Sequence, residues 1–174
     1  MIMTVEEAKS FVKFDGWTDQ KIELKLNSIE QVIRRYTNNN FQVRACRRAA
    51  DVVGGRFISA IAIPFKVGDT VQVSESGLNA GLYTVATVEG YEFTVKEPVE
   101  DETGVLVTRI AYPADIKEVV INLLEWETKH RDKIGIKSET LSRHSVTYED
   151  SASLYMGYPK GILGSLSLYM KARF

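Results

Sequence analysis

A change in hydrophobic period along the chain constrains the fold more than any other feature. Apolar residues recur every three or four positions toward both ends, whereas residues 41–112 carry β-branched runs broken by glycine. A helical period and a strand period belong to different elements, so the middle of the chain forms its own β-unit. We therefore predict an α+β protein with about four helices drawn from residues 1–40 and 113–174. Residues 41–112 are predicted to be an inserted antiparallel β-barrel or sandwich.

Two helices are predicted before the β-unit. The first covers Thr4 to Val12, because Thr4 and Glu7 have the spacing of a capping box, in which each side chain satisfies a backbone N–H group of the other residue. The second covers Asp19 to Tyr36 and ends at the asparagines 38–40. Its apolar stripe consists of Ile22, Leu26, Ile29, Ile33 and Tyr36.

Short strands separated by turns are predicted between residues 41 and 112, a pattern typical of small barrels and sandwiches. The expected strands are 71–73, 81–88, 91–95 and 105–110, and Gly54-Gly55 predicts a turn. The consecutive acids Glu100, Asp101 and Glu102 predict a solvated hairpin tip. A calcium loop needs alternating oxygen ligands around a glycine, so this acidic run does not indicate a metal site.

Helical periodicity returns after Tyr112-Pro113 and continues to about Lys129. Residues 135–148 then form a polar, serine-rich stretch that we expect to be extended. A last helix is predicted from near Pro159, although Gly161 and Gly164 each destabilise a helix by about 1 kcal/mol relative to alanine. Packing against the core or a partner must therefore order it. Its apolar side contains Ile162, Leu163, Leu166, Tyr169 and Met170.

Composition excludes several classes of protein. The 174 residues include 22 lysines and arginines against 23 acids, so overall charge alone would not hold the chain on nucleic acid or an acidic membrane. One cysteine, Cys46, excludes an internal disulfide and a thiolate zinc cluster. Without a signal-peptide pattern or a membrane-spanning run, we expect a soluble protein of a reducing compartment, with no membrane contact, metal or cofactor.

The search for catalytic motifs is negative. Neither a nucleophile elbow nor a phosphate-binding loop is present. His144 has serines on both sides, but the sequence places neither an orienting acid nor an oxyanion hole beside it. His130 is expected near a helix end, and Cys46 is expected to be a half-buried strand residue. We therefore expect a protein without enzymatic activity.

Charge is divided between two zones. Six arginines and one acid lie between residues 34 and 56, and six acids and one base lie between residues 89 and 102. The zones are solvated faces, or they meet between copies of the chain, or the arginines contact nucleic acid. A head-to-tail contact between copies would generate a ring whose register is fixed by charge. The residues expected in that contact are Arg44, Arg47, Arg48, Glu97, Glu100, Asp101 and Glu102.

Three C-terminal segments form a recognisable pattern. They are the helix opening Y-P-A-D-I at residues 112–116, the segment 135–148 containing G-I-K-S-E and S-V-T-Y, and a short helix that leads into L-Y-M-K-A-R-F at residues 168–174. Together with the T-x-E-E start and the amphipathic second helix, this pattern resembles the head–tail connector (adaptor) proteins of long-tailed bacteriophages. The resemblance covers both ends of the chain and leaves out residues 41–112.

The resemblance implies a non-enzymatic virion protein that forms a ring, usually twelve-fold, in the neck between portal and tail, and lets DNA pass. Its partners would be other copies, the portal protein and a stopper or tail-completion protein, and it would be found in the host cytoplasm during assembly. It implies an inter-subunit arm that includes Lys137, Ser138, Glu139, Leu141, Val146 and Tyr148. It also implies a portal-facing segment that includes Ile162, Leu163, Leu166, Tyr169, Met170 and Arg173.

Two other functions remain open. The segment Lys66 to Val71 resembles the opening of SH3-like barrels, some of which bind nucleic acid or peptides. Because such barrels serve unrelated functions, the β-unit could be a binding module of either kind. Another neck protein, such as a stopper or tail-completion protein, would have a similar size and chemistry, and the sequence does not distinguish it from a connector.

Overall fold

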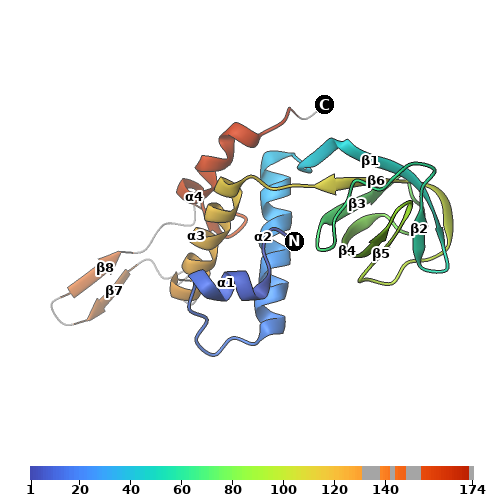
Figure 1. Ribbon diagram of the computed structural model, residues 1–174. Coiled ribbons are helices and arrows are strands. Elements are labelled where there is room, and N and C mark those ends of the chain that lie inside the picture. The colour runs from blue at the N-terminus through green and yellow to red at the C-terminus, as the bar shows by residue number, and fades with distance from the viewer. Residues whose placement is uncertain (131–137, 142–143, 148–153, 173–174) are drawn as a thin grey trace. The chain divides into compact units, whose positions relative to one another are not determined.

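The computed structural model describes residues 1–130, 138–141, 144–147 and 154–172, and the chain forms two compact units (Figure 1). The helical unit consists of Met1–Asn39 and Tyr112–Phe174, and the barrel unit consists of Asn40–Ala111. The protein is therefore α+β, with a closed barrel as its β-part.

Three helices supply most of the helical unit: α1 (Val5–Phe11), α2 (Asp19–Thr37) and α3 (Ala114–His130). The predicted stripe of α2 is confirmed, because Ile22, Leu26, Ile29 and Ile33 are buried, while Tyr36 is half-buried. The matching face of α3 buries Ile116, Val120, Leu123 and Leu124. The core of the helical unit thus combines residues from before and after the barrel.

The start of α1 is only partly as predicted. Thr4 caps the helix, since its hydroxyl oxygen accepts a hydrogen bond from the backbone N–H of Glu7 at 3.1 Å. The reciprocal half of the capping box was wrong, because the carboxylate of Glu7 instead accepts a hydrogen bond from Nζ of Lys117 at 2.7 Å. This ion pair ties α1 to α3 across more than one hundred residues of sequence.

The C-terminal part of the chain contains two small sheets and two short helices. Strands β7 (Ser138–Leu141) and β8 (His144–Thr147) form one sheet, and β9 (Leu154–Tyr155) and β10 (Tyr158–Pro159) form the other. The predicted last helix is divided into α4 (Lys160–Gly164) and the 3₁₀ helix η3 (Ser165–Tyr169). Glycine and serine are poor α-helix formers, which explains the change to a tighter last turn.

The barrel unit has six antiparallel strands in the closed order β1-β2-β5-β4-β3-β6. The β-unit was predicted to be a barrel or a sandwich, and the closed strand order makes it a barrel. Closure also leaves no free strand edge. All four predicted strands are present. The strands are β1 (Gln42–Val53), β2 (Arg56–Ile58), β3 (Thr70–Ser74), β4 (Gly81–Glu89), β5 (Glu92–Val95) and β6 (Glu102–Ile110).

Aromatic side chains fill the centre of the barrel. The rings of Phe57 and Phe93 stack at 4.6 Å, and the ring of Phe65 meets Phe93 edge-on at 5.3 Å. Valines from five strands surround them. The predicted turn at Gly54-Gly55 joins β1 to β2, and both glycines have positive φ angles, as a tight hairpin turn requires.

The prediction of a hairpin tip at residues 100–102 was wrong. Strand β6 pairs with β1 and β3 rather than with β5, so the acids lie where a crossing connection enters β6. Here Asp101 accepts a hydrogen bond from the backbone N–H of Gly54 at 2.7 Å. The acidic run therefore helps to hold the barrel loops together.

The chain enters and leaves the barrel at adjacent points. The backbone N–H of Ala111 donates a hydrogen bond to the carbonyl of Phe41 at 3.0 Å, and Gln42 pairs with Ile110. The two ends of the barrel unit therefore meet. Domains whose ends lie close together can be removed or inserted without stretching the remaining chain.

We expect the two units to fold separately. Replacing residues 41–111 by a short Gly-Ser linker should leave a helical protein with a cooperative thermal transition, and residues 40–111 alone should fold as a barrel. Circular dichroism with thermal melting measures both outcomes.

A deletion of residues 42–53 serves as the control, because losing β1 opens the barrel and should abolish the β-transition. Loss of cooperative unfolding in either separated unit would contradict the two-unit account.

Candidate functional site

The end of α2 holds the C-terminal segment in place. Asn38 adopts the left-handed conformation (φ 49°) and ends the helix, as asparagine does more readily than most residues. Its side-chain amide donates hydrogen bonds to the carbonyls of Lys171 and Ala172, at 3.4 and 2.9 Å. The asparagine run, predicted only to stop the helix, therefore also fixes the path of the C-terminal segment.

Two further contacts complete this attachment. The side-chain amide of Asn39 donates to the carbonyl of Tyr169 at 3.1 Å, and the backbone N–H of Lys171 donates to the carbonyl of Thr37 at 2.8 Å. Every acceptor among these contacts is a backbone carbonyl, so the attachment does not depend on the side chains of the C-terminal segment.

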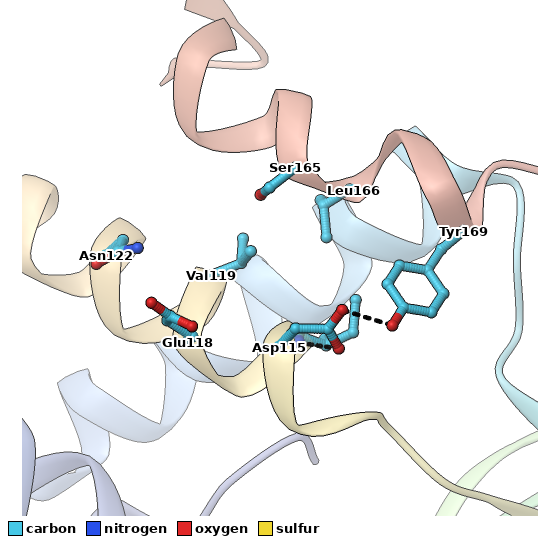
Figure 2. A pocket seen from close by; sticks show the side chains of 8 residues that line it. Asp115, Glu118, Val119, Asn122, Ser165, Leu166 and Tyr169 are labelled. Carbon is cyan, nitrogen blue, oxygen red and sulfur yellow. Dashed lines mark hydrogen bonds between the residues drawn. The ribbon is translucent and has the colours of Figure 1, made fainter.

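A hollow of about 180 Å³ lies between α3 and η3 (Figure 2). At one end the Tyr169 hydroxyl donates a hydrogen bond to the Asp115 carboxylate at 2.5 Å, and this bond raises the pKa of Tyr169. Glu118, Asn122 and Ser165 also line the hollow. The lining has two carboxylates and no basic residue, so the hollow is acidic in character.

The residues predicted to face the portal are divided by their burial. Leu163 and Leu166 are fully buried in the helical unit and belong to its core. Ile162 and Tyr169 are half-buried, and Met170 is exposed, while Arg173 lies outside the described residues. Fewer of the described residues in this segment therefore face outward than the prediction named.

Leu168 is the residue of this segment that the sequence analysis missed. It is 88% exposed, more than any other large apolar side chain among the described residues. The sequence contained a signal for it, because Leu168 is a large apolar residue between Ser167 and Tyr169 that lies outside the predicted apolar stripe. Leu168 and Met170 are both exposed, and Tyr169 between them in the sequence lines the hollow.

The predicted arm is a β-hairpin in its described residues. The register pairs Ser138 with Thr147 and Leu141 with His144, and within the described residues no other strand joins this sheet. Lys137 and Tyr148, also predicted for the arm, lie outside the described residues. A lone two-stranded hairpin is marginally stable in water, so contacts beyond its own pairing favour its formation.

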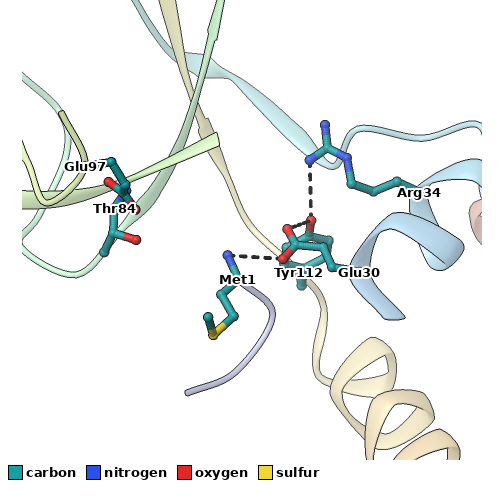
Figure 3. A network of polar contacts seen from close by, with 6 residues as sticks. All are labelled: Met1, Glu30, Arg34, Thr84, Glu97 and Tyr112. Atoms are coloured by element: carbon teal, nitrogen blue, oxygen red, sulfur yellow. Dashed lines mark hydrogen bonds and ion pairs between the residues drawn. The ribbon is translucent and has the colours of Figure 1, made fainter. Parts of the chain in front are cut away.

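A buried polar network surrounds Glu30 (Figure 3). Its carboxylate accepts a hydrogen bond from the Tyr112 hydroxyl at 2.6 Å and lies 3.3 Å from the amine of Met1. Arg34 donates to the Tyr112 oxygen at 3.5 Å. Burial, with the charge of Glu30, raises the pKa of Tyr112, so this hydroxyl stays protonated as a donor. The network fixes the first residue after the barrel onto α2.

Within the predicted charged contact, the arginines of β1 have partners inside the barrel unit. Nε of Arg47 donates to the Thr108 hydroxyl at 3.0 Å, and Nε of Arg48 donates to the carbonyl of Ala62 at 2.9 Å. Arg44 is exposed. Two of the three arginines thus contribute to the barrel itself.

The acids of the predicted contact are likewise divided into residues that are hydrogen-bonded within the barrel unit and residues that are exposed. Glu97 accepts a hydrogen bond from the backbone N–H of Thr84 at 3.0 Å (Figure 3), and Asp101 accepts one from Gly54. Glu100 is exposed. A contact between copies through this set stays a prediction, and Arg44 and Glu100 are the members best placed to make it.

Glu102 organises the loop between β3 and β4. Its carboxylate accepts hydrogen bonds from the Ser76 hydroxyl at 2.5 Å, the Gly77 backbone at 2.6 Å, the Asn79 amide at 2.8 Å and the Leu78 backbone at 3.4 Å. These bonds, that from Ser76 first, lower the pKa of Glu102 to about 2. The carboxylate therefore acts as a fixed anionic anchor of the loop.

Two further properties of the described residues concern metal binding and membrane crossing. Across residues 1–130 and the described C-terminal segments, no group of three or more His, Cys, Asp or Glu side chains could hold a metal ion. Cys46 is half-buried in β1, as predicted. The helices in the described part of the chain are too short or too polar to cross a membrane.

Comparison with known proteins assigns no family: no protein-family model matches the chain, and no curated protein matches it.

Asn38→Ala should loosen the C-terminal segment. The change removes two side-chain hydrogen bonds and places a β-carbon without a polar group in the left-handed conformation, so we expect a loss of about 1–2 kcal/mol in unfolding free energy. Amide hydrogen exchange over residues 166–172 should accelerate.

Asn27→Ala is the matched control, because Asn27 is exposed on the same helix, and its effect should stay within about 0.5 kcal/mol. Equal destabilisation by the two changes would contradict the attachment role of Asn38.

Glu102→Gln should remove an acid-sensitive part of barrel stability. The folded pKa of about 2 lies below the usual 4.5, so ionised Glu102 contributes stability that is present above pH 4.5 and is lost as the pH falls toward 2. Thermal unfolding across that range should show a flatter pH dependence for the variant. Glu75→Gln, at an exposed position in the same loop, should keep the wild-type slope.

Proposed function

We propose that this chain is a structural protein of a bacteriophage neck, a head–tail connector that forms a ring between the portal and the tail. One observation carries the proposal. The two sequence regions that resemble connectors, on either side of the barrel, fall within one compact unit. A resemblance shared by residues that fold together is stronger than the same resemblance spread over unrelated elements.

The hairpin formed by β7 and β8 suits an inter-subunit arm. Its strands have four residues each, and it forms a separate two-stranded sheet. A neighbouring subunit would supply the contacts that a hairpin of this size lacks in water. The free energy of ordering the arm is then recovered only on assembly, when a neighbouring copy supplies those contacts.

The C-terminal segment suits a docking element for the portal. Leu168 and Met170 are exposed, and Tyr169 between them in the sequence lines the hollow that contains Asp115 and Glu118. A partner surface with an apolar side chain next to a lysine or arginine would fit both features. Repetition of such a contact around a ring raises the overall avidity even when each contact is weak.

A second candidate is a binding module formed by the barrel unit. This unit has a closed core of its own, and its β2–β3 connection contains the Lys66–Asp69 turn, in which Asp69 accepts a hydrogen bond from the backbone of Lys66 at 2.8 Å. The exposed Arg44 could contact phosphate groups. A stopper or tail-completion protein remains the alternative within the neck itself.

A tagged pull-down from an induced lysate of the source, identified by mass spectrometry, tests the proposal. We expect the portal protein and a tail-completion protein to be recovered. Leu168→Asp with Met170→Asp should reduce recovery of the portal by about tenfold or more, since a charge replaces each apolar contact.

Val67→Asp is the control, because Val67 is also an exposed apolar residue but belongs to the barrel unit. Recovery of nucleic acid or host proteins without any virion protein would contradict the neck proposal and favour the binding module. Recovery of tail proteins without the portal would favour a stopper or tail-completion protein.

A further inference from the structure

Exposed apolar side chains gather where β2 ends and β5 begins. Ile61 is 61% exposed, Tyr91 58% and Ile58 38%. The backbone brings them together, because Ile58 pairs with Glu92, the N–H of Ser59 donates to the carbonyl of Tyr91 at 2.9 Å, and the N–H of Ile63 donates to the carbonyl of Gly90 at 3.0 Å. We call Ile58, Ile61 and Tyr91 the barrel patch.

Ile58 faces outward by the alternation of its strand, since its neighbour Phe57 is buried, and Glu92 faces outward beside the buried Phe93. Ile61 and Tyr91 lie outside the strands, and their exposed fractions place them at the surface. A cluster of exposed apolar residues around a tyrosine is typical of a protein contact site. The barrel core does not require these residues.

An acidic side borders the barrel patch. Glu89 and Glu92 are partners in register on β4 and β5, and they line a hollow of about 90 Å³ together with Arg56 and Thr94. Arg56 pairs with Glu92 at 3.3 Å, whereas Glu89 is exposed. The surface therefore fits a partner that has a basic side chain next to an apolar one.

The helical unit carries a surface of that kind on α2. Leu24 is 71% exposed, and Nζ of Lys21 lies 4.0 Å from the centroid of the Trp17 ring. Lys21 and Leu24 are three residues apart and share a helix face, away from the buried Ile22 and Leu26. We call Trp17, Lys21 and Leu24 the α2 patch.

We propose that the barrel patch of one copy docks on the α2 patch of a second copy. Leu24 would contact Ile58 and Tyr91, and Lys21 would lie toward Glu89. A second copy is the expected partner because the two patches are complementary: each combines an apolar surface with a charge opposite to that of the other patch. The inference rests on the proposed function and names a contact that would hold the ring together.

The two patches belong to different surfaces of the chain, so the contact is heterologous. Repeated heterologous contacts close into a ring when the rotation between copies divides a full turn. The contact also gives the barrel unit a role in a connector, because the barrel of each copy would bind the helical unit of its neighbour.

Charge reversal in the full chain tests the contact, with sedimentation equilibrium as the measurement of self-association. Lys21→Glu alone, and Glu89→Lys with Glu92→Lys, should each weaken association by about tenfold or more. The chain with all three changes should associate nearly as the wild type does, because the attraction is restored with its signs exchanged.

Lys96→Glu is the matched control for Lys21→Glu, and Glu75→Lys with Glu6→Lys is the control for the double change, since these make the same charge changes at exposed positions outside both patches. A second measurement uses Leu24→Cys and Tyr91→Cys in one chain with Cys46→Ser. Oxidation should then join different copies by a disulfide, and the single-cysteine chains should show no such product.

Monomeric wild-type protein at every accessible concentration, unchanged association in the single-patch variants, or no restoration in the combined variant would each overturn the proposed contact. Its failure is separate from failure of the neck proposal. If the chain recovers the portal but does not self-associate through these patches, only the contact is wrong. If it self-associates through them without binding virion proteins, only the neck assignment is wrong.

Discussion

The pairing of β1 with β6 is the interaction on which the rest of the structure depends. It closes the barrel, and it ends in the hydrogen bond between Ala111 and Phe41, where the chain enters and leaves. Because these ends meet, α2 and α3 can pack in one core although 76 residues separate Thr37 from Ala114. A barrel that failed to close would expose the edges of its strands.

The elements that the sequence predicted well are those whose signals are local. The stripe from Ile22 to Ile33 and the glycine turn at residues 54–55 depend on spacing within a few residues. Strand β1 was less evident because its register shifts between Gln42 and Arg47, which interrupts the alternation that identifies a strand. The strand order and the partners of Glu102 depend on contacts between distant residues, which no local pattern contains.

Less of the candidate surfaces than of the fold could be predicted from the sequence. Charge zones were visible in the sequence, but charge alone does not separate an exposed residue such as Arg44 from Arg47, whose guanidinium bonds to Thr108. The apolar stripe of the last helix assumed a period of 3.6, whereas η3 has a 3₁₀ geometry. With that period, the predicted stripe included Leu163 and Leu166, which are buried, and left out Leu168, which is exposed. Asn38 and Asn39 likewise serve as more than a helix stop, because their amides reach a segment about 130 residues away.

The central claim, that the chain is a ring-forming connector of the neck, is tested most directly by its abundance in purified virions. Quantitative mass spectrometry of intact particles would give the number of copies of this chain relative to the portal protein. The account predicts that the chain is present in particles and equimolar with the portal subunits, as matched rings require. Absence of the chain from particles that contain the portal and the tail would contradict it.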